Sequence, residues 1–115
     1  MSYDLAFWRY ERGDEGDHGE VYKRLSRGER VEGVALIRVE EILARVKETF
    51  HDWERLDDAT YDGGEKGGFE VFSTPQFFRV DCHGMAIDYV NRLIDIAHEF
   101  GCQLYDPQLD RRFGD

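Results

Sequence analysis

The feature that most constrains the fold is a pair of aromatic, β-branched runs in the second half of the chain. Phe69–Phe72 and Phe77–Cys82 are separated by four residues that include Pro75. Runs of this composition favour β-strands, and proline suits the turn between them better than a central strand. The pair therefore predicts a β-hairpin at the centre of the fold.

Amphipathic helices are predicted on both sides of this hairpin. Apolar side chains recur at helical spacing through residues 39–53 and again through residues 85–100. Gly101 follows the second stripe directly, and glycine favours helix termination. A shorter helix is predicted over residues 20–26, with Gly28 just beyond its end.

Two further strands complete the pattern. Residues 3–8 are rich in aromatic side chains and alternate weakly, and residues 102–105 form a short apolar run before Pro107. The order strand, helix, strand, strand, helix, strand predicts an α+β fold of the ferredoxin-like type. We expect a four-stranded antiparallel sheet with two long helices on one face, plus one short helix, and an open second face.

The length of the chain suits one domain. It has 115 residues, of which 41% are hydrophobic and 14% aromatic, enough for a packed core. We expect a single domain over residues 1–115. Glycine-rich acidic stretches predict loose loops near residues 11–19 and 56–68, and the polar tail 108–115 is expected to be loose as well.

The charge balance excludes several classes of partner. The chain has 25 acidic and 15 basic residues, for a net charge of −10, which disfavours binding to nucleic acids and to anionic membranes. No apolar run approaches the roughly 20 residues that span a bilayer. The N-terminus lacks a basic leader, and Cys82 and Cys102 do not form a disulfide scaffold. These features predict a cytoplasmic protein with two reduced thiols.

No motif for catalysis or metal binding is present. Cys82, His83, His98 and Cys102 show no zinc-ligand spacing, and the acids near Asp57 lack the order of a calcium loop. Phosphate-binding glycine motifs and the G-x-S-x-G nucleophile motif are absent. We therefore expect no enzymatic activity, no catalytic residues, no bound metal and no cofactor.

The two ends of the chain carry recognisable motifs. The opening Met1–Trp8 (MSYDLAFW) and the stretch His98–Gln108, which ends in Tyr-Asp-Pro-Gln, resemble those of a group of small bacterial proteins. Some of that group resemble immunity proteins, which are encoded beside secreted antibacterial toxins and neutralise them. The resemblance implies a non-enzymatic protein that blocks a cognate toxin domain. The Tyr105–Gln108 corner itself is interpreted as a strand-ending turn in preference to a surface contact.

The distribution of acids suggests where such a partner binds. Residues 40–65 contain nine acids and three bases, and residues 11–20 contain five acids and one base. An acidic field of this kind steers a basic partner, although it also serves solubility alone. The residues predicted to contact a basic toxin domain, with Tyr61 as an exposed aromatic anchor, are Asp14, Glu15, Asp17, Asp57, Asp58, Tyr61, Asp62 and Glu65.

Two alternatives stay open at this point. Arg79, Asp81 and His83 alternate on one side of a strand, so the chain could instead be a small ligand-binding or catalytic domain. The aromatic load also exceeds what one face of a four-stranded sheet needs, which favours a homodimer through the open sheet face. The aromatic residues concerned are Phe7, Trp8, Phe69, Phe72, Phe77 and Phe78.

Overall fold

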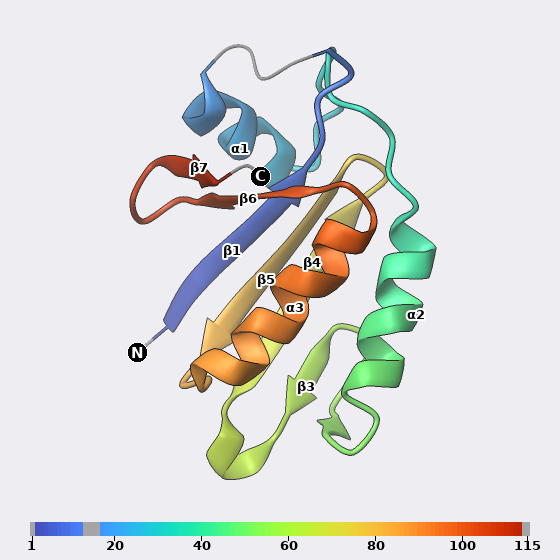
Figure 1. Cartoon of the computed structure of the whole chain (residues 1–115), viewed down its shortest axis with the longest axis vertical. Helices are drawn as coiled ribbons and strands as arrows, with labels where there is room; N and C mark the ends of the chain where they lie inside the picture. The colour runs from blue at the N-terminus through green and yellow to red at the C-terminus, as the bar shows by residue number, and fades with distance from the viewer. Residues whose placement is uncertain (1, 13–16, 114–115) are drawn as a thin grey trace.

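The computed structural model describes residues 2–12 and 17–113, which form one antiparallel sheet with helices on both faces (Figure 1). The strands of the described part are β1 (Ser2–Trp8), β2 (Glu54–Arg55), β3 (Thr60–Asp62), β4 (Gly68–Thr74), β5 (Phe77–His83), β6 (Gln103–Asp106) and β7 (Arg111–Phe113). They follow the order β2-β3-β4-β5-β1-β6-β7 across the sheet. The helices are α1 (His18–Ser26), α2 (Val39–Thr49) and α3 (Ile87–Glu99), with a 3-10 turn η1 (Gly64–Lys66).

The expected four-stranded ferredoxin-like sandwich is wrong. The sheet has seven strands, of which β1, β4, β5 and β6 correspond to the four that were predicted. The expected loop 56–68 contains β3 and η1, and the expected loose tail contains β7. These extra strands are short and polar. They form by backbone pairing, β3 with β4, β2 with β3 and β7 with β6, rather than through a strand pattern of their own.

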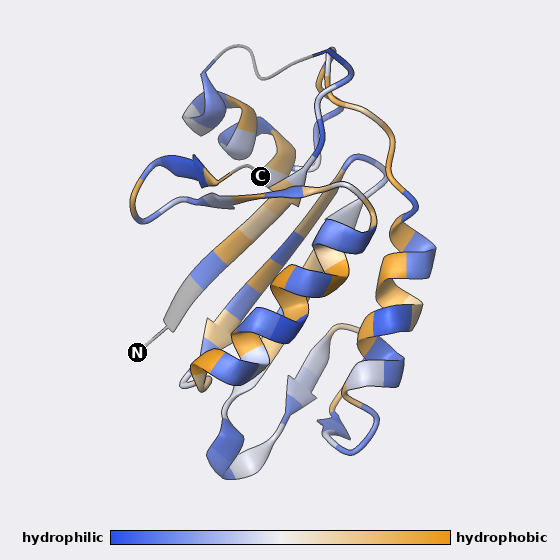
Figure 2. Ribbon diagram, in the orientation of Figure 1, coloured by the Kyte–Doolittle hydropathy of each residue, from blue (hydrophilic) through white to orange (hydrophobic). Residues whose placement is uncertain are grey.

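The main core lies between the sheet and the helices α2 and α3. Alternation along β1 directs Leu5 and Phe7 to this face, where they meet Val46 of α2 and Leu93 of α3, all of them buried. Figure 2 shows alternating hydrophobic and hydrophilic bands along both helices, as expected for elements with one buried side. Arg45 of α2 forms an ion pair with Glu99 of α3, at 2.8 Å, across the outer surface of the helix pair.

A second core lies on the other face of the sheet, beneath α1. Trp8, Phe77 and Tyr105 pack there against Leu25, the buried residue of α1. The segment 31–34 closes this core, and the buried Gln76 holds it in place. The Gln76 side chain accepts from Val31 N at 2.9 Å and donates to the carbonyl oxygens of Val31 and Val34, both at 2.8 Å.

The three predicted helices are confirmed with shifted ends. The helix expected over 39–53 stops at Thr49, and Trp53 turns back so that its ring packs 5.0 Å from that of Phe50. The helix expected over 20–26 begins two residues earlier, because Asp17 caps it by accepting from Glu20 N at 3.2 Å. Among residues 2–12 and 17–113, no helix has the length and apolar character needed to cross a membrane.

Candidate functional site

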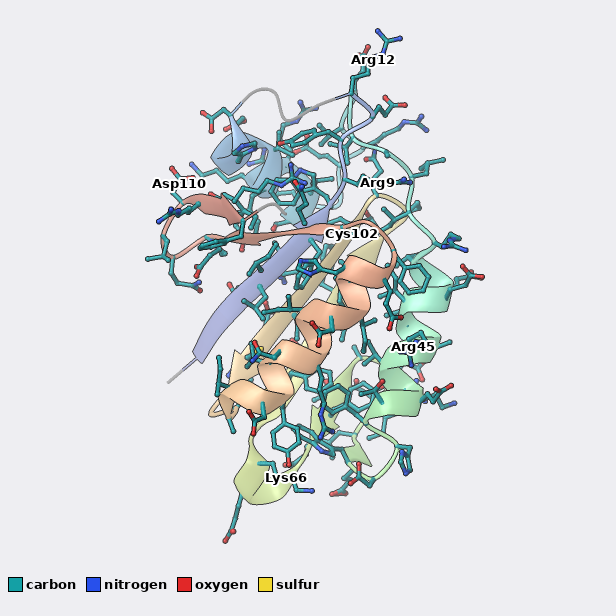
Figure 3. The ribbon with its side chains drawn as sticks, in the orientation of Figure 1. Arg9, Arg12, Arg45, Lys66, Cys102 and Asp110 are labelled. Carbon is teal, nitrogen blue, oxygen red and sulfur yellow. The ribbon has the colours of Figure 1, made fainter. Side chains whose placement is uncertain are left out.

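The two acidic segments predicted to form one partner site lie at opposite ends of the molecule. Asp14 and Glu15 fall outside the described residues, and Asp17 is the N-cap of α1. The acids from Asp57 to Glu65 lie around β2, β3 and η1, at the far end of the 39 Å long axis. Figure 3 labels Arg12 near the first end and Lys66 at the second. The structure therefore does not bring the two segments together.

The second end carries a cluster of exposed acids, here called the acidic edge. Residues 48–70 contain eight acids and only two bases, Arg55 and Lys66. Both bases form exposed ion pairs, at 3.6 Å with Asp58 and at 3.8 Å with Asp52, which contribute little energy. All eight acids of the acidic edge are exposed, namely Glu48, Asp52, Glu54, Asp57, Asp58, Asp62, Glu65 and Glu70.

Hydrogen bonds to the backbone hold two of these acids in place. Asp57 accepts from Ala59 N and Asp62 accepts from Gly64 N, each at 2.8 Å. The bond from Ala59, followed by one from the Thr60 side chain, lowers the pKa of Asp57. Both carboxylates are consequently held in turns by the backbone.

Tyr61 is not the exposed anchor that was expected. It is only 5% exposed, because pairing of β3 with β4 places it in the main core, where its ring stacks on that of Phe69 at 4.8 Å. The exposed apolar residue of this region is Leu56, whose exposed fraction is 58%. Leu56 borders a shallow groove of about 230 Å³ whose other walls include Thr60, Glu70 and His83.

Glu70 of this segment also belongs to a row of three acids across the sheet, on the face opposite α2 and α3. Strand register pairs Asp4 with Asp81, and Asp81 with Glu70. Neighbouring strands lie about 4.8 Å apart, so the carboxylates follow one another closely from β1 through β5 to β4. We call Asp4, Asp81 and Glu70 the carboxylate row. Glu70 pairs in turn with Thr60 of β3, so the row reaches the groove beside Leu56.

Arg79 of β5 lies on the same face as this row. Arg79 binds Asp81 through two contacts, Nε to Oδ1 at 3.0 Å and Nη2 to Oδ2 at 3.2 Å. Its guanidinium also lies over the ring of Phe72, 4.9 Å from the ring centre. Partial burial raises the pKa of Asp4, and the neighbouring Asp81 raises it further. Like charges opposite one another destabilise a sheet, so the row carries electrostatic repulsion that Arg79 only partly relieves.

Sequence reasoning found this row only in part. Arg79, Asp81 and His83 were placed correctly on one side of a strand, but Arg79 and Asp81 bind each other. Asp4 and Glu70 were missed because they lie 77 and 11 residues from Asp81 in the sequence, and only the strand register joins them. The available signal was that each occupies a polar position in an otherwise apolar strand.

The two cysteines are buried. Burial raises the pKa of the Cys82 thiol to about 12 and that of Cys102 to about 11, so neither is a ready nucleophile. Within residues 2–12 and 17–113 no group of three His, Cys, Asp or Glu side chains is placed to hold a metal ion. Strand alternation directs Cys82 into the main core and His83 to the other face, so the two form no dyad.

The two terminal motifs contact each other. Beyond the end of β6, the side-chain amide of Gln108 takes the place of a paired strand beside β1. It accepts from Asp4 N at 2.8 Å and donates to the Asp4 carbonyl at 3.2 Å. Asp106 holds the corner by accepting from Gln108 N at 3.0 Å. Within the described residues, the Tyr105–Gln108 corner thus has a structural role.

The surplus aromatic residues are used within the chain. Phe7, Phe69 and Phe78 belong to the main core. Trp8 and Phe77 are buried in the second core, with Phe72 packed against it. The aromatic surface that favoured a homodimer is therefore covered by α1, and the oligomeric state remains a prediction.

Comparisons with protein-family models, curated proteins and solved structures gave no match. The resemblance of the two terminal motifs therefore stays a prediction.

Proposed function

We propose that this protein is a non-enzymatic, immunity-type binding protein that neutralises a cognate bacterial toxin by covering the toxin's active site. The observation that carries the proposal is the acidic edge, where eight acids and two bases fall within residues 48–70. The resemblance of the terminal motifs to small bacterial proteins supports the same function. A partner that acts on nucleic acid has a basic active site, which these carboxylates would occupy in place of phosphates.

The geometry of the acidic edge suits rapid and specific association. A concentrated field of one sign accelerates the encounter with a partner of opposite charge and makes the rate fall with added salt. Asp57 and Asp62 are fixed by backbone hydrogen bonds, so less conformational freedom is lost on binding. Leu56 adds exposed apolar surface beside a polar rim, the usual arrangement of an interface.

A protection assay tests the function. The product of the adjacent gene is expressed in a sensitive bacterium, with and without this chain, and survivors are counted. We expect the neighbour to kill and this chain to rescue. A harmless neighbour, or killing that this chain does not prevent, would contradict the proposal.

A charge variant tests the surface. Replacing Asp57, Asp58 and Glu65 by Asn, Asn and Gln should slow association with the toxin and flatten its salt dependence. The matched control removes the same charges from exposed positions elsewhere, at Asp88, Asp95 and Glu32. Equal association rates for the two triple variants would mean that the acidic edge does not guide the partner.

A further inference from the structure

The sheet face opposite α2 and α3 is covered only in part. The half that holds Trp8 and Phe77 is packed beneath α1 and the segment 31–34. The other half holds the carboxylate row, together with Thr60 and the exposed His83. Among the described residues, no hydrophobic cluster covers this second half. The side chains of Arg79 and Asp81 at its centre are 21% and 20% exposed, and Glu70 and His83 at its edge are exposed.

The charge of this uncovered half is complementary to a basic group. Three carboxylates occupy adjacent strands, and Arg79 balances one of them. Glu70 stands at the exposed end of the row, beside the groove that Leu56 borders. That groove measures about 230 Å³, below the roughly 300–1,000 Å³ of typical small-molecule sites. Its size suits a single inserted side chain better than a whole ligand.

Arg79 shows how a guanidinium binds on this surface. It makes two parallel contacts to one carboxylate while its flat face lies over the Phe72 ring. The forked geometry of arginine matches carboxylates in a way that the single charge of lysine does not. A second guanidinium approaching Glu70 would meet an exposed carboxylate next to the apolar surface of Leu56.

We infer that the partner contact extends from the acidic edge onto this uncovered half-face, where Glu70 and Asp4 of the carboxylate row receive an arginine-bearing segment of the partner protein. The inference rests on the proposed function and specifies the chemistry of the partner. Binding of a cation would relieve the repulsion between Asp4 and Asp81. The partner's positive charge would therefore be placed where like charges oppose one another in the free protein.

The probe for this surface is a short, end-blocked peptide of alternating arginine and serine. Its neutral counterpart carries citrulline in place of arginine. The peptides are titrated into the nitrogen-15-labelled full chain, and backbone amide shifts are followed. We expect saturable shifts at Leu56, Thr60, Glu70 and Asp81 with the arginine peptide, and none with the citrulline peptide.

Two double variants complete the experiment. Asp4→Asn with Glu70→Gln should lower the affinity for the arginine peptide about fivefold or more. The control, Asp95→Asn with Glu32→Gln, removes equal charge and should leave that affinity nearly unchanged. Glu70→Gln alone, at an exposed position, serves if the double variant folds poorly. Shifts that do not saturate, that map to the outer faces of α2 and α3, or that persist unchanged in the Asp4 and Glu70 variant would overturn the inference.

The two proposals fail in different ways. If the Asp4 and Glu70 variant protects cells as well as the unaltered chain while the Asp57, Asp58 and Glu65 variant does not, this inference is wrong and the immunity function stands. If the unaltered chain gives no protection but the peptide binds the carboxylate row, the immunity function is wrong and the arginine-binding surface stands.

Discussion

The two halves of the sheet face opposite α2 and α3 differ in what covers them. The aromatic half holds Trp8 and Phe77, and the acidic half holds the carboxylate row. Along β1, successive residues on this face are Asp4, Ala6 and Trp8. Along β5 they are Phe77, Arg79 and Asp81. The aromatic end of both strands is covered by α1, whereas the carboxylate end has no covering helix among the described residues. The same strands therefore present a buried aromatic layer at one end and a charged, partly exposed layer at the other.

The difference shows two separate effects. Strand alternation determines the sheet face on which a side chain lies, and the polarity of that side chain determines whether another element packs over it. Burying an aromatic ring is favourable, but burying a carboxylate without a partner is costly. The boundary runs through Arg79, which lies over Phe72 on the aromatic side and binds Asp81 on the acidic side. The aromatic half forms a buried core, and the acidic half keeps its carboxylates outside that core.

The largest effect is expected at the centre of the aromatic half. Trp8→Ala removes a fully buried ring that contacts the rings of Tyr10, Phe77 and Tyr105. It should lower the free energy of unfolding by about 3–5 kcal/mol, because a large cavity opens beneath α1. Chemical denaturation measures the loss, and Trp8→Phe should recover much of it. A loss below about 1 kcal/mol would show that the second core is unimportant for the fold.

A smaller effect is expected from the buried hydrogen bonds that the Gln76 side chain forms in the aromatic half. Gln76→Ala leaves three backbone groups of Val31 and Val34 without their buried partner, at a cost of about 2 kcal/mol. Hydrogen exchange should rise first in residues 31–34 and in α1, while α2 and α3 stay protected. The neighbouring Thr74→Ala serves as control, since it removes one hydrogen bond to Gln76 N. Uniform loss of protection throughout the sheet would mean that the halves do not unfold separately.

At the rim of the acidic half, Gln108→Ala should destabilise the fold by about 1 kcal/mol. The substitution removes both side-chain bonds to the Asp4 backbone and leaves that part of β1 unpaired on one side. Gln103→Ala is the control, because the Gln103 side chain makes no hydrogen bond within the described part of the chain. Thermal denaturation compares the two variants, and equal midpoints would remove the structural role assigned to the Tyr105–Gln108 corner.

Sequence alone identified the elements whose own pattern determines them. The helices around Val46 and Leu93 and the strands around Phe69 and Val80 carry clear periodicity. It missed β2, β3 and β7, which form because a neighbouring strand offers backbone partners. Tyr61 was expected to be exposed because glycines and acids surround it in sequence. Its face is decided by pairing with Phe69, a contact that no local pattern reveals.

The same limit applies to the carboxylate row. Asp4, Glu70 and Asp81 are each unremarkable in sequence, and only the register of three strands places them in line. The acidic edge was predictable because its acids are close in sequence. The row was not, because its acids are close only in space.

The smallest effect is expected in the acidic half, where the like charges should lower the free energy of unfolding. The pKa of Asp4 is raised above its ordinary value of 3.8, so folding favours the protonated carboxyl. That contribution to stability is fully present below about pH 3.8 and is lost as the pH rises through the higher pKa of the folded state. At neutral pH the ionised Asp4 therefore disfavours the folded state, and Asp4→Asn should stabilise it by about 0.5 kcal/mol after allowance for solvent screening.

The gain should shrink toward zero near about pH 3, where Asp4 is protonated in both the folded and the unfolded chain. Denaturation of the two proteins across this pH range gives the difference directly. If Asp4→Asn instead destabilises the protein at neutral pH, the carboxylate is needed by the fold itself and the row is structural. If it stabilises the free chain and weakens the arginine peptide, the acidic half retains a repulsion that only a basic partner relieves.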